Sequence, residues 1–328
     1  LLSPMLTDLT FTASPQEVGT RLDAALLARC PTSSRAFCRQ AIVAGRVYVN
    51  GRPGLKGGKL AAMDIVQVQR LKERDDNRVQ PDPDVPVDLV FADEALLAFN
   101  KPAGIAVQPL SSDERGTLMN GAVARFPELA ALGDQPLMAG ALHRIDAETS
   151  GLVLAARSAQ AFDALRAQFA AQTVEKRYLA VVEGHVAVPG RLTHDLAHHP
   201  GLAFCRMVDA RSLAGAPRRL HAETAYRPLG FIGPNTLLEV TIFTGVTHQI
   251  RCQLALGGWP IVNDILYGAR PVAGCTRHLL HALAARFTHP VSGRPCCIEA
   301  PAPEAFQPIS EGQRTRGVPG ARTAPSAR

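Results

Sequence analysis

Short apolar or alternating segments are spread along this chain, with helically spaced segments between them. The segments that should form strands are 47–49, 65–68, 96–99, 152–155, 178–182 and 237–243. The segments that should form helices are 22–30, 35–44 and 161–170. This succession predicts an α+β fold: a body built on a mainly antiparallel mixed sheet with a central cleft, plus a small α/β domain.

Local composition divides the chain into five parts. Residues 1–14 show no periodicity and are expected to be a leader, and residues 15–72 form a first compact domain. Residues 73–86 are polar and proline-rich, as linkers are. Residues 87–310 form the body, and residues 311–328, rich in Gly, Pro, Ser and Arg, are expected to be a disordered basic tail.

The net charge of +6 is unevenly distributed. Residues 15–72 hold ten Lys and Arg against three acidic residues, or +7, and residues 311–328 hold four Arg against one Glu, or +3. Asp8 contributes −1, so residues 73–310 carry about −3. A basic module joined to a mildly acidic body predicts a polyanion-binding unit attached to a domain with another task.

Cysteine usage and hydropathy restrict the compartment. The seven cysteines are scattered and contain no C-x-x-C pair, so buried thiols are expected rather than a disulfide framework or a zinc site. No apolar run approaches the roughly 18–20 residues of a membrane span, and the N-terminus lacks the order of a signal peptide. The chain is therefore expected to be cytosolic, with no membrane partner and no metal.

A first polar segment, residues 142–151, runs directly into the apolar strand Leu152-Val153-Leu154. An aspartate held rigidly by a core strand, Asp146, can act as a nucleophile or general base. The alternative is a structural role, in which Asp146 pairs with Arg144 or caps a turn.

A second segment, residues 175–184, is expected to be a strand. Alternation places Lys176, Tyr178, Ala180 and Val182 on one face. Tyr178 could then stack on a nucleic-acid base, or be an ordinary half-buried strand aromatic.

A third segment, residues 244–254, follows the end of a strand. Thr247 is expected to cap a helix that Gly257-Gly258 stops, which would gather polar side chains at the helix start. Arg251 is the residue expected to pair with a buried aspartate, unless it is a plain surface arginine.

In this order, the motifs H-R-I-D-x-x-T-S-G, K-R-Y-x-A-x-V-x-G and T-G-x-T-H-Q-I-R resemble the RNA pseudouridine synthases that act on large-subunit ribosomal RNA and some transfer RNAs. Shorter matches are N-K-P-A-G at 100–104, P-I-V at 260–262 with L-Y-G at 266–268, and L-H-A at 280–282 with F-T-H-P at 287–290. The resemblance covers residues 88–300.

The resemblance implies a role for each matched residue. Asp146 would be the nucleophile, Arg251 its cationic partner, and Tyr178 the ring that stacks on the target base and assists proton removal from C5. Arg144 would fill the space that a flipped-out uridine leaves in the RNA, and Leu280 would pack below the base. Further RNA contacts would come from His143, Thr149, Lys176, Thr247, His248 and Gln249. The reaction is an isomerisation, so no cofactor is expected.

Residues 19–68 resemble the S4-like RNA-binding domain that many of these synthases carry at the same position. The match rests on R-L-D, on Ser34-Arg35 and on G-x-V-x-V-N-G. Arg35, Arg39 and Arg46 would bind RNA phosphates there. The expected substrate is large-subunit (23S) ribosomal RNA, whose uridines the enzyme would convert to pseudouridine, with transfer RNA as the alternative. A monomer is expected to bind it.

The sequence departs from the family pattern at five positions. These are Ala147 for a basic residue, Val246 for Arg, Gln253 for His, Gln108 for His and Asn263 for Gly. These departures leave open which uridine is modified. They also leave open a second hypothesis, an RNA-binding assembly factor with impaired catalysis. A third reading is a small-molecule hydrolase or lyase that uses Asp146 with His143 or His248, but it gives the basic module no purpose.

Overall fold

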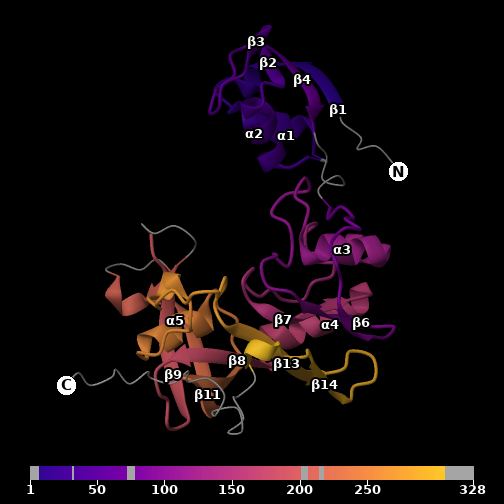
Figure 1. Ribbon diagram of the computed structural model, residues 1–328. Helices are drawn as coiled ribbons and strands as arrows, with labels where there is room; N and C mark the ends of the chain where they lie inside the picture. Colours follow the sequence, from indigo (N-terminus) through magenta and orange to yellow (C-terminus); the bar gives the residue numbers. More distant parts are fainter. Residues whose placement is uncertain (1–6, 32, 72–77, 201–205, 214–217, 307–328) are drawn as a thin grey trace, which may run out of the picture. The chain divides into compact units, whose positions relative to one another are not determined.

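The computed structural model describes residues 7–31, 33–71, 78–200, 206–213 and 218–306 (Figure 1). The chain forms two compact units. The first combines residues 1–86 with 108–141, and the second combines 87–107 with 142–328. In this division the chain crosses between the units three times, and the predicted boundary near residue 87 stays a prediction.

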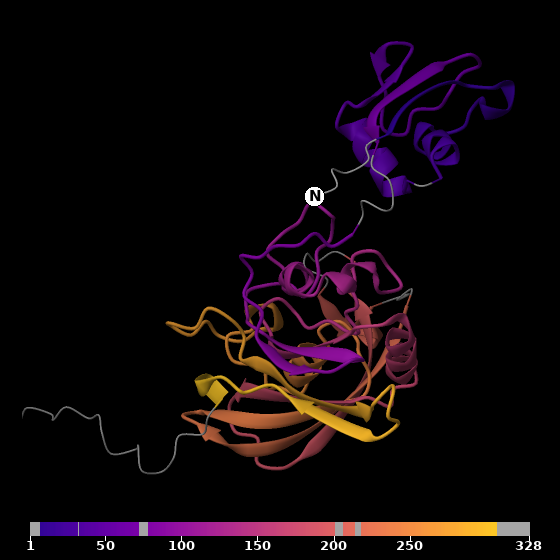
Figure 2. The same cartoon turned by 90° about the vertical axis from the view of Figure 1, so that its right-hand side faces the viewer.

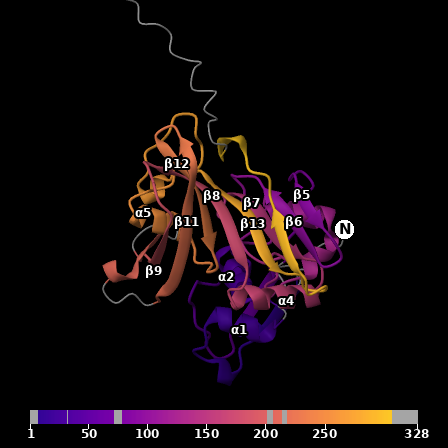
Figure 3. The same cartoon turned by 90° about the horizontal axis from the view of Figure 1, so that it is seen from below.

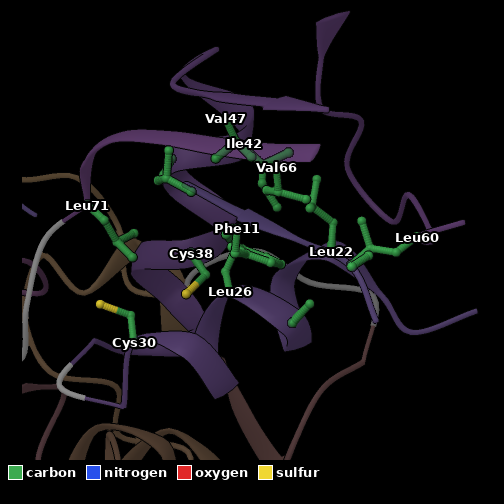
Figure 4. Packing of buried hydrophobic residues seen from close by; sticks show 14 residues of the cluster. Phe11, Leu22, Leu26, Cys30, Cys38, Ile42, Val47, Leu60, Val66 and Leu71 are labelled. Carbon is green, nitrogen blue, oxygen red and sulfur yellow. The ribbon is translucent and has the colours of Figure 1, made fainter. Parts of the chain in front are cut away.

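The first unit contains a four-stranded sheet covered by two helices. The strand order is β1-β4-β2-β3. Figure 4 shows the apolar core between sheet and helices, where Leu26 and Cys38 are fully buried. The elements are β1 (Thr7–Thr12), the 3₁₀ turn η1 (Pro15–Glu17), α1 (Leu22–Arg29), α2 (Arg35–Val43), β2 (Val47–Val49), β3 (Arg52–Pro53) and β4 (Ile65–Leu71).

Local chemistry sets the ends of these elements as predicted. The Ser34 hydroxyl accepts a hydrogen bond from the Phe37 amide at 3.2 Å and so caps α2. Asn50 and Gly51 both have positive φ, +51° and +77°, as a tight hairpin turn between β2 and β3 requires.

The leader prediction fails for the part of residues 1–14 that the structure describes. Thr7–Thr12 form β1, which pairs antiparallel with β4, and Phe11 is buried in the core. Only Leu9 and Phe11 alternate in this segment, which is too few for a periodic signal, and its partner strand lies more than fifty residues away. The predicted tail at 311–328 lies outside the described residues.

The predicted linker also packs more than expected. Among residues 78–86, Val79 is buried, and the carbonyl of Gln80 accepts a hydrogen bond from the Asn120 side chain at 2.7 Å. The Asp82 amide donates to the Asn120 carbonyl at 3.0 Å. These bonds tie the segment to α3 (Leu118–Arg125), which the 3₁₀ turn η3 (Pro127–Ala131) follows.

The described residues of the second unit form ten strands in the order β10-β9-β11-β12-β8-β13-β7-β6-β5, with β14 paired to β13. Figure 2 and Figure 3 show this sheet from two further sides. Among the described residues every pair is antiparallel except β13 with β7. The predicted mainly antiparallel mixed sheet is thus confirmed. The strands are β5 (Leu89–Ala92), β6 (Leu96–Lys101), β7 (Ser150–Ala156), β8 (Glu175–Glu183), β9 (Gly190–His198), β10 (Met207–Asp209), β11 (Leu220–Ile232), β12 (Asn235–Ile242), β13 (Leu280–Thr288) and β14 (Pro295–Glu299).

Two helices complete this unit. Helix α4 (Ala159–Ala170) is capped by the Ser158 side chain, and its predicted apolar face buries Phe162 and Leu165. Helix α5 (Gln249–Leu256) ends at Gly257 as predicted. Its N-cap is His248 with φ of +51°, so the predicted cap at Thr247 is wrong. The remaining 3₁₀ turns are η4 (Ala210–Ser212), η5 (Ile265–Tyr267) and η6 (Glu304–Phe306).

The six cysteines that the structure describes form no disulfide, and three of them (Cys30, Cys38 and Cys252) are buried. Cys297 is exposed, so the expectation of buried thiols holds only in part.

Among the described residues, each helix is too short or too polar to cross a lipid bilayer.

Candidate active site

The three polar segments singled out in the sequence meet at one pocket of the second unit. The segment before β7, strand β8, the start of α5 and the start of β13 all contribute to it. Its lining consists of Arg144, Ile145, Asp146, Thr149, Tyr178, Ile242, Val246, His248, Gln249, Ile250, Arg251 and Leu280.

Arg251 links two carboxylates at this pocket. Its Nη1 donates to Asp146 Oδ2 at 2.8 Å. Its Nε and Nη2 donate to the two oxygens of Asp264 at 2.7 and 2.8 Å, so the Asp264 pair is bidentate. The Asp264 side chain is 1% exposed, whereas that of Asp146 is 28% exposed toward the pocket. One carboxylate is therefore buried behind the arginine, and the other remains accessible.

The charges of Arg251, Asp264 and Asp146 stabilise one another. Burial opposes the cation of Arg251 most strongly, but hydrogen bonds and attraction from Asp264 and Asp146 outweigh it and raise the pKa of Arg251. The guanidinium is thus a permanent cation whose orientation Asp264 fixes. The Arg251 cation lies 2.8 Å from Asp146 Oδ2, so it attracts the accessible carboxylate as well as the buried one.

Tyr178 lies in the middle of β8, paired with Val240 of β12 and Ala282 of β13. Its side chain is 7% exposed and borders the pocket. Burial, together with the negative charge of Asp146, raises the pKa of the phenol above its ordinary value. The hydroxyl is therefore neutral, and the ring offers an aromatic face to a bound base.

Close backbone packing brings β7 against β13 just after the Asp146 segment. Gly151 has φ of +112°, and a Cβ there would lie 2.2 Å from the Ala282 carbonyl oxygen. Only glycine fits, which gives a physical reason for the last position of the H-R-I-D-x-x-T-S-G motif. This packing places Leu280 near Asp146. The Thr149 hydroxyl also bonds His278 Nε2 at 2.8 Å.

His248 and Gln249 line the pocket from the start of α5. His248 Nε2 is 3.8 Å from Asp146 Oδ1, and its Nδ1 is 3.1 Å from the Tyr267 hydroxyl. Burial lowers the pKa of His248, which favours the neutral ring. The Gln249 amide bonds inward, to the Thr244 hydroxyl at 2.9 Å and the Glu223 carbonyl at 2.9 Å.

Three residues predicted to contact RNA do not line the pocket. His143 accepts a hydrogen bond from the Leu154 amide at 3.1 Å, and burial lowers its pKa to about 3. Lys176 donates to the carbonyls of Phe243 and Thr244, both at 2.9 Å. Thr247 is exposed on the loop before α5. The first two side chains support the backbone around the site.

Sequence reasoning assigned no role to Lys101 or Asp264, although both lie in or beside motifs that carried the resemblance. The ammonium of Lys101 is fully buried and donates to the carbonyls of Pro102, Ile105 and Ala147, each at 2.8 Å. Burial lowers its pKa to about 8. Lys101 thereby fastens the residue that follows Asp146 to the turn after β6.

In the first unit, the three arginines predicted to bind RNA differ in their contacts. Arg35 is exposed at the start of α2. Arg39 pairs with the buried Asp23 at 2.8 Å, as does Arg21 at 2.9 Å, and hydrogen bonds, chiefly from Arg21, lower the pKa of Asp23 to about 2. Arg46 is partly buried and donates to the Arg70 carbonyl at 3.1 Å.

Comparison with known proteins finds two matching family models and several relatives of similar length. Residues 95–256 match the family model described as RNA pseudouridylate synthase, and residues 20–60 match the S4 domain model. A protein of Xanthomonas campestris named ribosomal large subunit pseudouridine synthase D is 34% identical over 90% of this chain and 89% of its own length. The protein of that name from Escherichia coli O6:H1 is 31% identical over 93% of this chain and 94% of its own length.

Solved structures show the same fold. The human RNA pseudouridylate synthase domain containing 1 superposes with a TM-score of 0.55 over 70% of this chain and 89% of that one, at 24% identity. The human domain containing 4 protein gives 0.52 over 67% and 90%, at 20% identity. The chain belongs to the RNA pseudouridylate synthase family. It is an RNA pseudouridine synthase, an isomerase, and carries an S4 domain.

Proposed function

We propose that this enzyme converts specific uridines of large-subunit (23S) ribosomal RNA to pseudouridine, with Asp146 as the nucleophile. The observation that carries the proposal is the 2.8 Å pair between Arg251 Nη1 and Asp146 Oδ2 at a pocket that Tyr178 and Leu280 also line. The relatives named ribosomal large subunit pseudouridine synthase D favour ribosomal RNA over the alternative substrate, transfer RNA.

The chemistry needs one accessible carboxylate oxygen. Arg251 binds Oδ2 of Asp146, and the side chain is 28% exposed, so we assign the attack to Oδ1, from which His248 Nε2 is 3.8 Å away. That oxygen forms a bond to the ribose C1′ or to the uracil ring, and the N1–C1′ bond breaks. The base rotates, C5 bonds to C1′, the carboxylate leaves, C5 loses its proton and N1 gains one. Atoms balance, and neither oxidant nor reductant is consumed.

The uridine must leave the RNA stack to reach this pocket. Flipping costs about a few kcal/mol, which contacts in the pocket must offset. We assign this task to the Tyr178 ring and to Leu280, between which the uracil would lie. Arg144, which is exposed at the pocket, would occupy the vacated space in the RNA.

Affinity for the RNA chain would come largely from the S4 domain. Its basic side chains neutralise phosphates without reading sequence. Arg35, Arg39 and Arg46 are the candidates, and Arg21 joins them because it shares Asp23 with Arg39. We propose that the enzyme acts as a monomer, in the cytoplasm where ribosomal RNA is modified.

Pseudouridine mapping tests this function. Total RNA from cells with and without the gene is mapped, and the gene is returned as wild type or as Asp146→Asn. We expect one or a few uridines of 23S RNA to lose modification in the deletion strain and to regain it only with the wild-type gene. Loss confined to transfer RNA would overturn the ribosomal assignment. Equal rescue of growth by both genes would instead favour an assembly factor whose catalysis is dispensable.

A further inference from the structure

Asn263 occupies a backbone position where its side chain is not needed for the turn. Its φ is +64°, in the left-handed region that glycine adopts freely and asparagine tolerates. Glycine is the usual residue here in the pattern that the motifs resemble. The asparagine therefore adds an amide at a point where the backbone alone could turn.

This amide closes a loop of the second unit. Its Oδ1 accepts a hydrogen bond from the Val272 amide at 3.0 Å. Its Nδ2 donates to the carbonyls of Cys275 and Arg277 at 3.1 and 3.2 Å. The partners lie in residues 268–279, which form neither helix nor strand. The three hydrogen bonds of this one side chain thus hold the loop, where no backbone hydrogen bonds of a helix or strand do so.

Both ends of the loop lead into the pocket. Before it, Asp264 fixes the orientation of Arg251. After it, His278 bonds to the Thr149 hydroxyl in the Asp146 segment at 2.8 Å, and Leu280 lines the pocket. A loop that moved would carry His278 and Leu280 with it, because only a few residues separate them from the Arg277 carbonyl.

We propose that Asn263 is a positioning residue of this enzyme, whose amide holds residues 268–278 in place and thereby keeps Leu280 and His278 set for the target uridine. The proposal rests on the proposed function for its substrate. Asn263 touches neither the uridine nor Asp146; it acts through the loop. A family member with glycine at this position must hold the corresponding loop by other contacts.

The direct test is the substitution Asn263→Gly, which restores the usual residue. Glycine adopts φ of +64° without strain, so the variant should fold. Asn50→Gly is the matched control, because Asn50 also has positive φ (+51°) and its amide also closes a loop, through Asp64 and Ile65 in the first unit.

Three quantities are compared: amide hydrogen exchange at Val272, RNA affinity, and the single-turnover rate at saturating enzyme. In Asn263→Gly we expect Val272 to exchange at least tenfold faster. We expect the maximal rate to fall about tenfold, since small misplacements of substrate-positioning groups slow catalysis by up to about a hundredfold. RNA affinity should stay within twofold. Asn50→Gly should change neither Val272 exchange nor the maximal rate.

A purely structural tether would give a different pattern. If Val272 exchanges faster but the maximal rate stays within twofold of wild type, the loop does not position the site and the proposal fails. Unchanged exchange at Val272 also overturns it. Hydrogen exchange needs no RNA, so it still judges the loop contact if the wild-type enzyme forms no pseudouridine, an outcome that would defeat the proposed function instead.

Discussion

Arg251 gives Asp264 two hydrogen bonds and Asp146 only one. The bidentate pair lies behind the pocket and fixes the plane of the guanidinium, while the single bond reaches the accessible carboxylate. In the proposed mechanism, a nucleophile held by one hydrogen bond keeps lone pairs free for attack. We therefore propose that Asp264 acts on the reaction through Arg251.

Replacing Asp264 with asparagine tests this relationship. Asp264→Asn removes one of the two charges that share Arg251, and we expect the single-turnover rate to fall by about 10- to 100-fold with RNA affinity unchanged. The matched control is Asp209→Asn, because Asp209 also binds an arginine, Arg211, through both carboxylate oxygens but lies outside the pocket. Equal rates for wild type and Asp264→Asn would show that the bidentate pair only supports the fold.

Tyr178→Phe separates the ring from the hydroxyl. The phenylalanine ring keeps the stacking surface, so RNA binding and melting temperature should change little. If the hydroxyl assists proton removal from C5, the rate should fall by about 10²–10⁴-fold, the range for general acid–base catalysis. A fall that is reversed by a substrate whose C5 proton is already labile would support this role. A rate within twofold of wild type would restrict Tyr178 to stacking.

Lys101→Met tests the support beneath the Asp146 segment. Methionine fills similar space but leaves three carbonyls without their donor, and an unsatisfied buried acceptor costs about 1–3 kcal/mol. Urea unfolding should therefore show a loss of that size. Lys56→Met, at an exposed position in the first unit, should change stability by less than about 0.5 kcal/mol. Equal stability of the two variants would contradict the role given to Lys101.

Because two histidines are buried, we expect the free energy of unfolding to decrease in acid. Burial lowers the pKa of His278 and of His281 from the ordinary 6.5 to about 4. Between these values the unfolded chain binds protons that the folded chain does not, so stability decreases as the pH falls from 6.5 toward 4. Each histidine contributes roughly 1 kcal/mol of this loss at pH 5.5.

Urea unfolding at pH 7.5 and pH 5.5 measures the effect. His278→Gln should lower the difference between the two pH values, whereas His221→Gln, at an exposed position, should leave it unchanged. A wild-type protein equally stable at both pH values would rule out neutral buried histidines.

The sequence predicted the elements with strong local patterns and the residues with distinctive motifs. The predicted pairing of Asp146 with Arg251 is present in the structure, with Asp146 in the segment before β7 and Arg251 in the first turn of α5. Strands β9 and β11 were missed because Gly, Arg and His interrupt their apolar positions, and β1 because only its distant partner β4 makes it a strand.

Side-chain contacts were harder to predict than positions. Nothing in the local pattern distinguishes a lysine that binds RNA from one, such as Lys176, whose ammonium bonds two backbone carbonyls. Asp264 shows its role only in three dimensions, since Arg251 lies thirteen residues away on another element. Such contacts depend on tertiary packing, which the local hydrophobic periodicity of the sequence does not determine.

Asp146→Asn tests the central claim most directly. The amide keeps the size of the side chain and can still contact Arg251, so folding and RNA affinity should be retained. We predict that a single-turnover assay on 23S RNA, at saturating enzyme, detects pseudouridine with the wild type and none above background with Asp146→Asn. Pseudouridine formed by the variant at a rate within tenfold of wild type would contradict Asp146 as the nucleophile.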